Sequence, residues 1–280
     1  MTAFGDAHAG GGTGDSGGAD PQAQAQAHAH AVAAESGRFV SLLGGADLST
    51  PVPGCPGWTL LDLVRHTGSV HRWFSVLLRT NVQEPPATRA VDLDLPERED
   101  SYAYAAWLAA GADLAARTFA EVDPDATMWT WGADPHARFW VRRMLHETLV
   151  HRVDAEAALG LRPVIDPALA ADGVDEFLVN LPFATPFAPG VARLRGQGET
   201  IRFRATDQQE QGRDRDWVVR LSVDRFGLVD GEQQSVDASV HGSAADLLLL
   251  LYGRLGRDSG AFQVAGDTGL LDRWFAHSAF

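Results

Sequence analysis

The chain has 280 residues, which is enough for two domains that each bury a core of their own. Its formal net charge of −14 argues against a nucleic-acid backbone or an anionic membrane as the main partner, because both favour a basic surface. Hydrophobic residues make up 45% of the sequence, but no apolar run is long enough to span a bilayer, so we expect a globular protein that acts on a small molecule.

Residues 1–24 are rich in Gly, Ala and Asp and nearly lack large apolar side chains. Such a segment cannot bury enough surface to offset the entropy lost on ordering, so the sequence predicts a disordered tail. The segment also lacks the basic start and apolar core of a secretory signal, which favours a cytoplasmic protein. The lone cysteine, Cys55, fits a reducing compartment and excludes metal sites that need several cysteines.

Residues 25–162 have a helical pattern of apolar residues, with four predicted helices near 25–44, 59–80, 99–122 and 136–160. The second helix has a clear start, because Thr59 can cap it and Asp62 can return a hydrogen bond to the cap. The helix lengths and the loops between them are typical of an antiparallel four-helix bundle.

Residues 163–280 form a predicted second domain, which begins where prolines become frequent around one short helix near 168–180. Alternating stretches at 200–207 and 216–224 predict strands, and a third strand near 235–241 precedes helices at 243–256 and 267–277. The expected fold class is therefore α+β: a four-helix bundle followed by a smaller α+β domain with a mainly antiparallel sheet.

The fourth predicted helix contains HETLVH at 146–151, which is similar to a zinc-protease motif but differs in spacing. His146 and His151 are five residues apart, so at about 100° per residue they point about 140° apart and cannot share a metal without distortion. Glu147 and His151 are four apart and can converge on one ion. The same geometry predicts that Arg143 and His146 lie toward the side of the helix opposite Glu147 and His151. Without a third ligand, a hydrogen-bonded Glu–His pair on a solvated face is the simpler interpretation.

The second predicted helix offers His66 and His71 as a third ligand, and their spacing of five residues suggests that only one faces the bundle. His66 lies near the apolar stripe that contains Leu63 and Val70, so it is the better candidate. His66, Glu147 and His151 would make a His₂Glu site with open positions, the composition of many catalytic zinc centres. Side chains that could support these ligands by hydrogen bonds are Asp154, Asp62 and His71.

Two longer stretches of the sequence surround these residues, VPGCPGWTLLDLVRH at 52–66 and RRMLHETLVHRVDAEAALG at 142–160. They closely resemble the N-terminal domain of the mycothiol-dependent maleylpyruvate isomerase family, a relative of the DinB-like helical bundles. The family's metal ligands fall on His66, Glu147 and His151. The stretch ADLLLLLYGRL at 245–255 is similar to the family's C-terminal helix, and its arginine matches Arg254. The resemblance covers most of 30–160 through strong motifs and 165–280 through weak ones.

The resemblance implies a divalent metal, with zinc favoured, and the low-molecular-weight thiol mycothiol as cofactors. Mycothiol belongs to actinobacteria, and a high-GC genome fits this chain, in which all 23 basic residues are arginine. The metal would hold the thiol as a nucleophilic thiolate, which adds to an electrophilic double bond and, in the isomerase reaction, leaves again after rotation. An anionic dicarboxylate such as maleylpyruvate would need an arginine anchor, for which Arg254 is the candidate and Arg65 and Arg152 are rivals.

Other functions remain compatible with the same residues. A DinB-like thiol S-transferase would use the same activated thiol but keep it attached to the electrophile. A metal-activated water would make the protein a hydrolase, and a closed metal site would make it a non-enzymatic binding or interaction module. Cys55 and Trp58 lie in the CPGW turn, where we expect structural roles.

Overall fold

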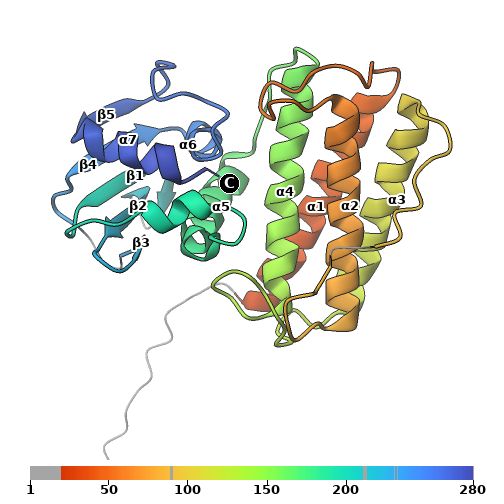
Figure 1. The fold of residues 1–280 in the computed structure, drawn as a ribbon, viewed down its shortest axis with the longest axis horizontal. Helices are drawn as coiled ribbons and strands as arrows, with labels where there is room; N and C mark the ends of the chain where they lie inside the picture. Colours follow the sequence, from red (N-terminus) through yellow and green to blue (C-terminus); the bar gives the residue numbers. More distant parts are fainter. Residues whose placement is uncertain (1–19, 89–90, 211–212, 230, 232, 280) are drawn as a thin grey trace, which may run out of the picture.

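The computed structural model describes residues 20–88, 91–210, 213–229, 231 and 233–279. A helical bundle and a smaller part with a sheet lie side by side (Figure 1). In the bundle, α1 and α2 each pack against both α3 and α4. This arrangement confirms the predicted four-helix bundle. The four helices are α1 (Pro21–Leu43), α2 (Leu60–Thr80), α3 (Ser101–Glu121) and α4 (Ala137–Ala158).

Local capping residues determine where the first two helices begin. At α2, the Thr59 N–H donates to Asp62 Oδ2 at 2.9 Å and the Asp62 N–H donates to Thr59 Oγ1 at 3.3 Å, which is the predicted capping box. At α1, Asp20 is the cap and Pro21 the first helical residue. Helix α1 therefore begins at Pro21, before the predicted end of the tail at residue 24. Residues 1–19 of the predicted tail lie outside the described part of the chain.

The second part of the chain contains a five-stranded sheet in the order β3-β2-β1-β4-β5. β1 pairs with β4 in parallel and every other pairing is antiparallel, so the predicted α+β class with a mainly antiparallel sheet is confirmed. The strands are β1 (Thr200–Glu210), β2 (Arg213–Leu221), β3 (Phe226–Leu228), β4 (Ala238–Gly242) and β5 (Gln263–Gly266). The helices are α5 (Pro167–Asn180), α6 (Ala244–Leu251) and α7 (Thr268–His277), with 3₁₀ turns η1 (Leu181–Phe183) and η2 (Pro189–Arg193).

Three details of this part differ from the sequence-based prediction. The strands β3 and β5 were not predicted, because one is three residues long and the other is an exposed edge strand of four. Helix α6 ends at Leu251, before the predicted end at 256. Gly253, with φ of +70°, lies just beyond that end, in the left-handed conformation that commonly terminates helices.

The sheet packs on the helices through one face, to which alternate residues of β1 contribute. Ile201, Phe203 and Ala205 on β1 are fully buried in a cluster with apolar residues of α5, α6 and α7. The alternating residues Arg202 and Arg204 both pair with Asp216 on β2. This period of two is typical of a strand with one covered face.

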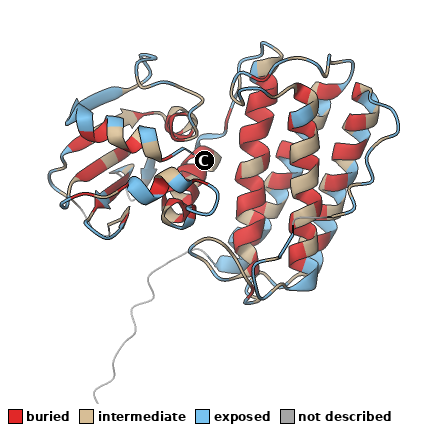
Figure 2. Ribbon diagram, in the orientation of Figure 1, coloured by how far each residue is buried: buried red, intermediate tan, exposed pale blue. Residues whose placement is uncertain are grey.

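Helix α4 is buried along most of its length, as Figure 2 shows. Trp140 and Met144 pack inside the bundle, whereas Leu149 and Val153 belong to the cluster that continues into α5 and α6. Because both parts cover this helix, each of its polar side chains must find a partner or face a cavity. No helix in the described part of the chain has the length and apolar composition needed to cross a bilayer.

Candidate functional site

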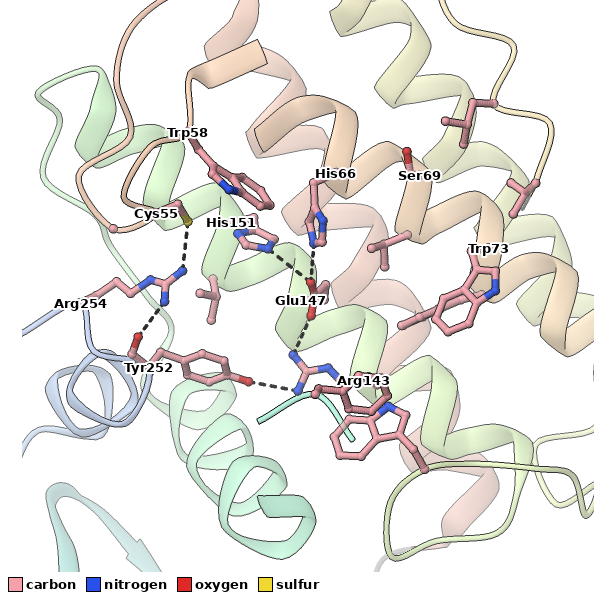
Figure 3. Close-up of a pocket in the computed structure, with 18 of the residues that line it drawn as sticks. Cys55, Trp58, His66, Ser69, Trp73, Arg143, Glu147, His151, Tyr252 and Arg254 are labelled. Carbon is pink, nitrogen blue, oxygen red and sulfur yellow. Dashed lines mark hydrogen bonds and ion pairs between the residues drawn. The ribbon is translucent and has the colours of Figure 1, made fainter. Parts of the chain in front are cut away.

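Three side chains from α2 and α4 converge on one point (Figure 3). His66 Nε2 lies 2.9 Å from Glu147 Oε1, and His151 Nε2 lies 3.3 Å from the same oxygen. The three potential ligand atoms all lie within 4.8 Å of one another. The structure thus brings together the residues selected from the sequence, and their spacing would allow them to bind one cation.

The three groups are open to solvent to different degrees. The exposed fraction of the side chain is 35% for His66, 22% for Glu147 and 11% for His151. Trp58 covers the two imidazoles, with ring centroids 5.1 Å from His66 and 6.3 Å from His151. The indole therefore packs on the site as well as holding the CPGW turn to the bundle, and the remaining open side faces a pocket.

Arg143 binds the second oxygen of Glu147, with Nη2 donating to Oε2 at 3.0 Å. The expectation that Arg143 lies on the other side of α4 is wrong, because it is itself four residues from Glu147 and shares that face. Its Nη1 donates to Glu176 Oε2 at 2.6 Å and to Tyr252 Oη at 3.0 Å. Burial acts to raise the pKa of Glu147, but hydrogen bonds with His151 and His66 and the charge of Arg143 hold it well below its usual value. Glu147 is therefore ionised.

His151 has a second partner behind it. Its Nδ1 lies 3.1 Å from Asp154 Oδ2, and Arg254 grips the same carboxylate through Nε at 3.0 Å and Nη2 at 2.8 Å. Burial opposes ionisation of Asp154, yet its contacts with His151 and Arg254 lower its pKa to about 2. Burial also opposes a charge on His151, but Asp154, Cys55 and Glu147 raise its pKa well above the ordinary value.

The other proposed supporting residues have different roles. Asp62 serves the α2 cap. His71 is fully buried, with Nε2 2.9 Å from Thr148 Oγ1, so the expectation that only one of the two α2 histidines faces the bundle is wrong. His146 points to α5, where Nε2 lies 2.7 Å from Asp172 Oδ2, as expected for a residue that does not share a ligand set with His151.

Of the three candidate arginines, Arg254 lines the pocket beside the metal-ligand candidates. It follows α6 after a turn, and its Nη2 also donates to Cys55 Sγ at 3.3 Å. Arg65 binds Tyr104 and Glu99, and Arg152 is fully buried between Glu35 and Glu156. Neither rival is placed to anchor a ligand in this pocket.

A second cluster adjoins the first. Cys55, His151 and Asp154 also offer ligand atoms within 4.8 Å of one another. Asp154 is already bound by Arg254 through two hydrogen bonds, and a cation there would lie beside that guanidinium. Arg254 binds both oxygens of Asp154, whereas Arg143 binds only Oε2 of Glu147 and leaves Oε1 directed at the two imidazoles. Charge repulsion is therefore weaker at Glu147 Oε1, which favours the cluster with His66 as the cation site.

The pocket has a volume of about 720 Å³, within the range of sites for drug-sized ligands. Both parts of the chain line it. The spacing of Arg143 from Glu147 and the position of Tyr252 beside Arg254 were signals that could have identified both residues from the sequence. Phe187 gave no such signal. Residues of the pocket that the sequence analysis did not select include Trp73, Trp131, Arg143, Phe187 and Tyr252.

Comparison with known proteins gives matches over both parts of the chain. The family model described as mycothiol maleylpyruvate isomerase N-terminal domain matches residues 29–156, and the corresponding MDMPI C-terminal domain matches 168–273. A crystal structure of the mycothiol-dependent maleylpyruvate isomerase is 15% identical, with a TM-score of 0.54, and the match covers 86% of this chain and 92% of that chain. A mutant of that enzyme with a histidine replaced by alanine is 14% identical with the same TM-score and coverage. The chain has no significant match among curated proteins.

Proposed function

The chain belongs to the mycothiol-dependent maleylpyruvate isomerase family, and we propose from this premise that it is a metal-dependent enzyme that uses a low-molecular-weight thiol. His66, Glu147 and His151 hold a divalent cation, with zinc favoured. Mycothiol is the thiol, and its reaction is addition to an electrophilic double bond of a small molecule in the cytoplasm. Arg254 is the arginine that contacts a bound ligand.

The convergence of two imidazole nitrogens and one carboxylate oxygen carries this proposal. That donor set suits zinc, and three protein ligands leave a coordination position for an exogenous group. A divalent cation at this position favours the thiolate form of a nearby thiol, which is the nucleophilic form.

The surrounding residues fix the donor atoms. Arg143 binds Glu147 Oε2 and leaves Oε1 directed at the two imidazoles. Asp154 accepts a hydrogen bond from His151 Nδ1, which directs Nε2 toward Glu147. Such partners typically orient metal ligands, and their loss costs about 10–100-fold in metal affinity. Both partners are connected to the second part of the chain, through Tyr252 and Arg254.

A thiol S-transferase is the second candidate function. The pocket is large, and aromatic residues line it on the side of Trp73, Trp131 and Phe187. Such a pocket suits an electrophile larger than a small dicarboxylate, whose thiol adduct would be the final product. The two reactions share the thiol and the metal ligands and differ in what leaves the enzyme.

Metal analysis of the purified protein tests the ligand assignment. We expect one equivalent of metal in the wild type and its loss in His66→Ala, Glu147→Ala and His151→Ala. His30→Ala is the matched control, because this histidine is exposed on α1. Full metal content in all three variants would show that the assignment is wrong.

Assays with maleylpyruvate, with and without mycothiol, test the use of a thiol. Turnover in the absence of any thiol would refute it. Where turnover requires the thiol, recovery of free thiol identifies an isomerase, and a thioether product identifies an S-transferase.

A further inference from the structure

The pocket has two chemically different ends, with the metal-ligand candidates between them (Figure 3). Cys55 and Arg254 lie on one side of His66, Glu147 and His151. Trp73 lies on the other side. We refer to the first as the polar end and to the second, formed by Val70, Trp73, Phe74, Trp131 and Phe187, as the aromatic end.

Separate segments build the aromatic end. Trp73 is on α2, Trp131 lies between α3 and α4, and Phe187 lies between η1 and η2 in the second part of the chain. Trp131 and Phe187 meet across the two parts with ring centroids 5.5 Å apart at 72°. Trp73 is held from behind by Trp140, at 5.7 Å. The aromatic surface is thus supported on both sides of the pocket.

The arginines that line the described pocket already bind carboxylates. Arg143 is paired with Glu147 and Glu176, and Arg254 makes two hydrogen bonds to Asp154. A substrate with two carboxylates would compete with these buried ion pairs, and separating one of them leaves a protein carboxylate without its partner.

Val70, Phe74 and Phe187 carry no polar side-chain atom, and the indoles of Trp73 and Trp131 can donate a hydrogen bond but not accept one. Ser69 lines the pocket near Trp73, and its hydroxyl donates to the Arg65 carbonyl at 2.6 Å. A sugar hydroxyl placed against Val70 or Phe187 would lose its water without gaining a hydrogen bond from these side chains. An apolar group loses nothing there and gains ring contacts.

We propose, on the basis of the thiol chemistry proposed above, that the electrophile binds at the aromatic end and carries an aromatic or similarly bulky apolar group instead of the carboxylates of a dicarboxylate. The thiol then approaches from the polar end. The substrate class is therefore an aromatic, electron-poor alkene such as an aryl enone.

Isothermal titration calorimetry with two unreactive ligands tests this assignment on the full-length protein as purified. Benzylacetone is the saturated analogue of an aryl enone, and succinate is a saturated dicarboxylate. We expect benzylacetone to bind more tightly than succinate. Phe187→Ala should weaken benzylacetone binding about tenfold, from the ring contact and the buried area that it removes.

Phe183→Ala is the matched control, because Phe183 and Phe187 are 47% and 41% exposed and only Phe187 lines the pocket. The control should leave the affinity unchanged. Trp73→Leu, on the opposite wall, gives a second measurement and should also weaken benzylacetone binding.

Succinate binding as tightly as benzylacetone, or unchanged benzylacetone affinity in Phe187→Ala and Trp73→Leu, would overturn the inference. These titrations use no thiol and no turnover, so they are independent of the metal and thiol assays that test the proposed function. If the enzyme proves specific for dicarboxylates, the proposed function stands and the inference about the substrate class is wrong.

Discussion

Replacing Arg143 with methionine should destabilise the protein more than any exposed arginine substitution. The side chain is 4% exposed and binds Glu176, which is 1% exposed, together with Glu147 and Tyr252. Methionine has nearly the same length but no charge, so Glu176 keeps only Asn180 Nδ2, at 3.2 Å from Oε1, as a side-chain partner among these contacts. Removing one partner of a buried ion pair costs about 3–5 kcal/mol.

Urea unfolding at neutral pH measures this loss as a change in the free energy of unfolding. Arg98→Met is the matched control, because Arg98 pairs with Asp100 at an exposed position and should contribute little. The double variant Arg143→Met with Glu176→Gln removes the buried carboxylate that the single change leaves unpaired. It should therefore recover part of the stability.

Two results would refute this reasoning. One is a decrease in the free energy of unfolding of Arg143→Met no greater than that of Arg98→Met. The other is a double variant that is less stable than Arg143→Met alone. Metal content provides an independent readout, since Glu147 loses the group that orients it and metal affinity should fall about 10–100-fold.

Further changes address packing, protonation and the choice of metal cluster. In Gly68→Ala the new Cβ would overlap the indole of Trp107, which should lower the free energy of unfolding by about 1–3 kcal/mol. Gly37→Ala on α1 places its Cβ in open space and should stabilise the protein by up to about 1 kcal/mol. Thermal unfolding compares the two variants. Burial and the charge of Arg72 lower the pKa of His71 to about 4, so as the pH falls the unfolded chain takes up this proton before the folded chain does. The contribution of His71 to stability is therefore complete above pH 6.5 and should fall by about 3 kcal/mol between pH 6.5 and 4. Urea unfolding of His71→Gln over this range should lack that loss. Cys55→Ser should retain its metal on elemental analysis, and metal loss would instead assign the ion to the cluster of Cys55, His151 and Asp154.

The sequence predicted those features that depend on local interactions. Caps and prolines mark helix starts within a few residues, and helical periodicity places Glu147 beside His151 without knowledge of the tertiary structure. His66 was harder to select from the sequence, because both histidines of α2 contact α4. His66 lies at the pocket and His71 in the core of the bundle, and only their positions along α2 distinguish them.

Contacts between the two parts of the chain could not be predicted in the same way. The pair of Arg254 with Asp154 joins residues 100 positions apart, and the contact of Trp131 with Phe187 depends on how a loop of each part meets the other. The periodicity of apolar residues in the sequence gives no information on how the two parts of the chain pack against each other. The same limit applies to Arg254, whose match to the family's arginine is visible in the sequence but whose pairing with Asp154 is not.

The electrostatics of the site depend on both parts of the chain together. Glu147 is on the bundle, yet the guanidinium that binds it is itself held by Glu176 and Tyr252. Asp154, behind His151, receives two hydrogen bonds from Arg254. Each ligand candidate on α4 is therefore oriented by a residue that the second part positions. A bundle without its partner would keep the three donor residues together with Arg143 and Asp154. It would lose Glu176, Tyr252 and Arg254, which hold those two side chains in place, so the pairing of the two family domains in one chain has a physical reason at the site itself.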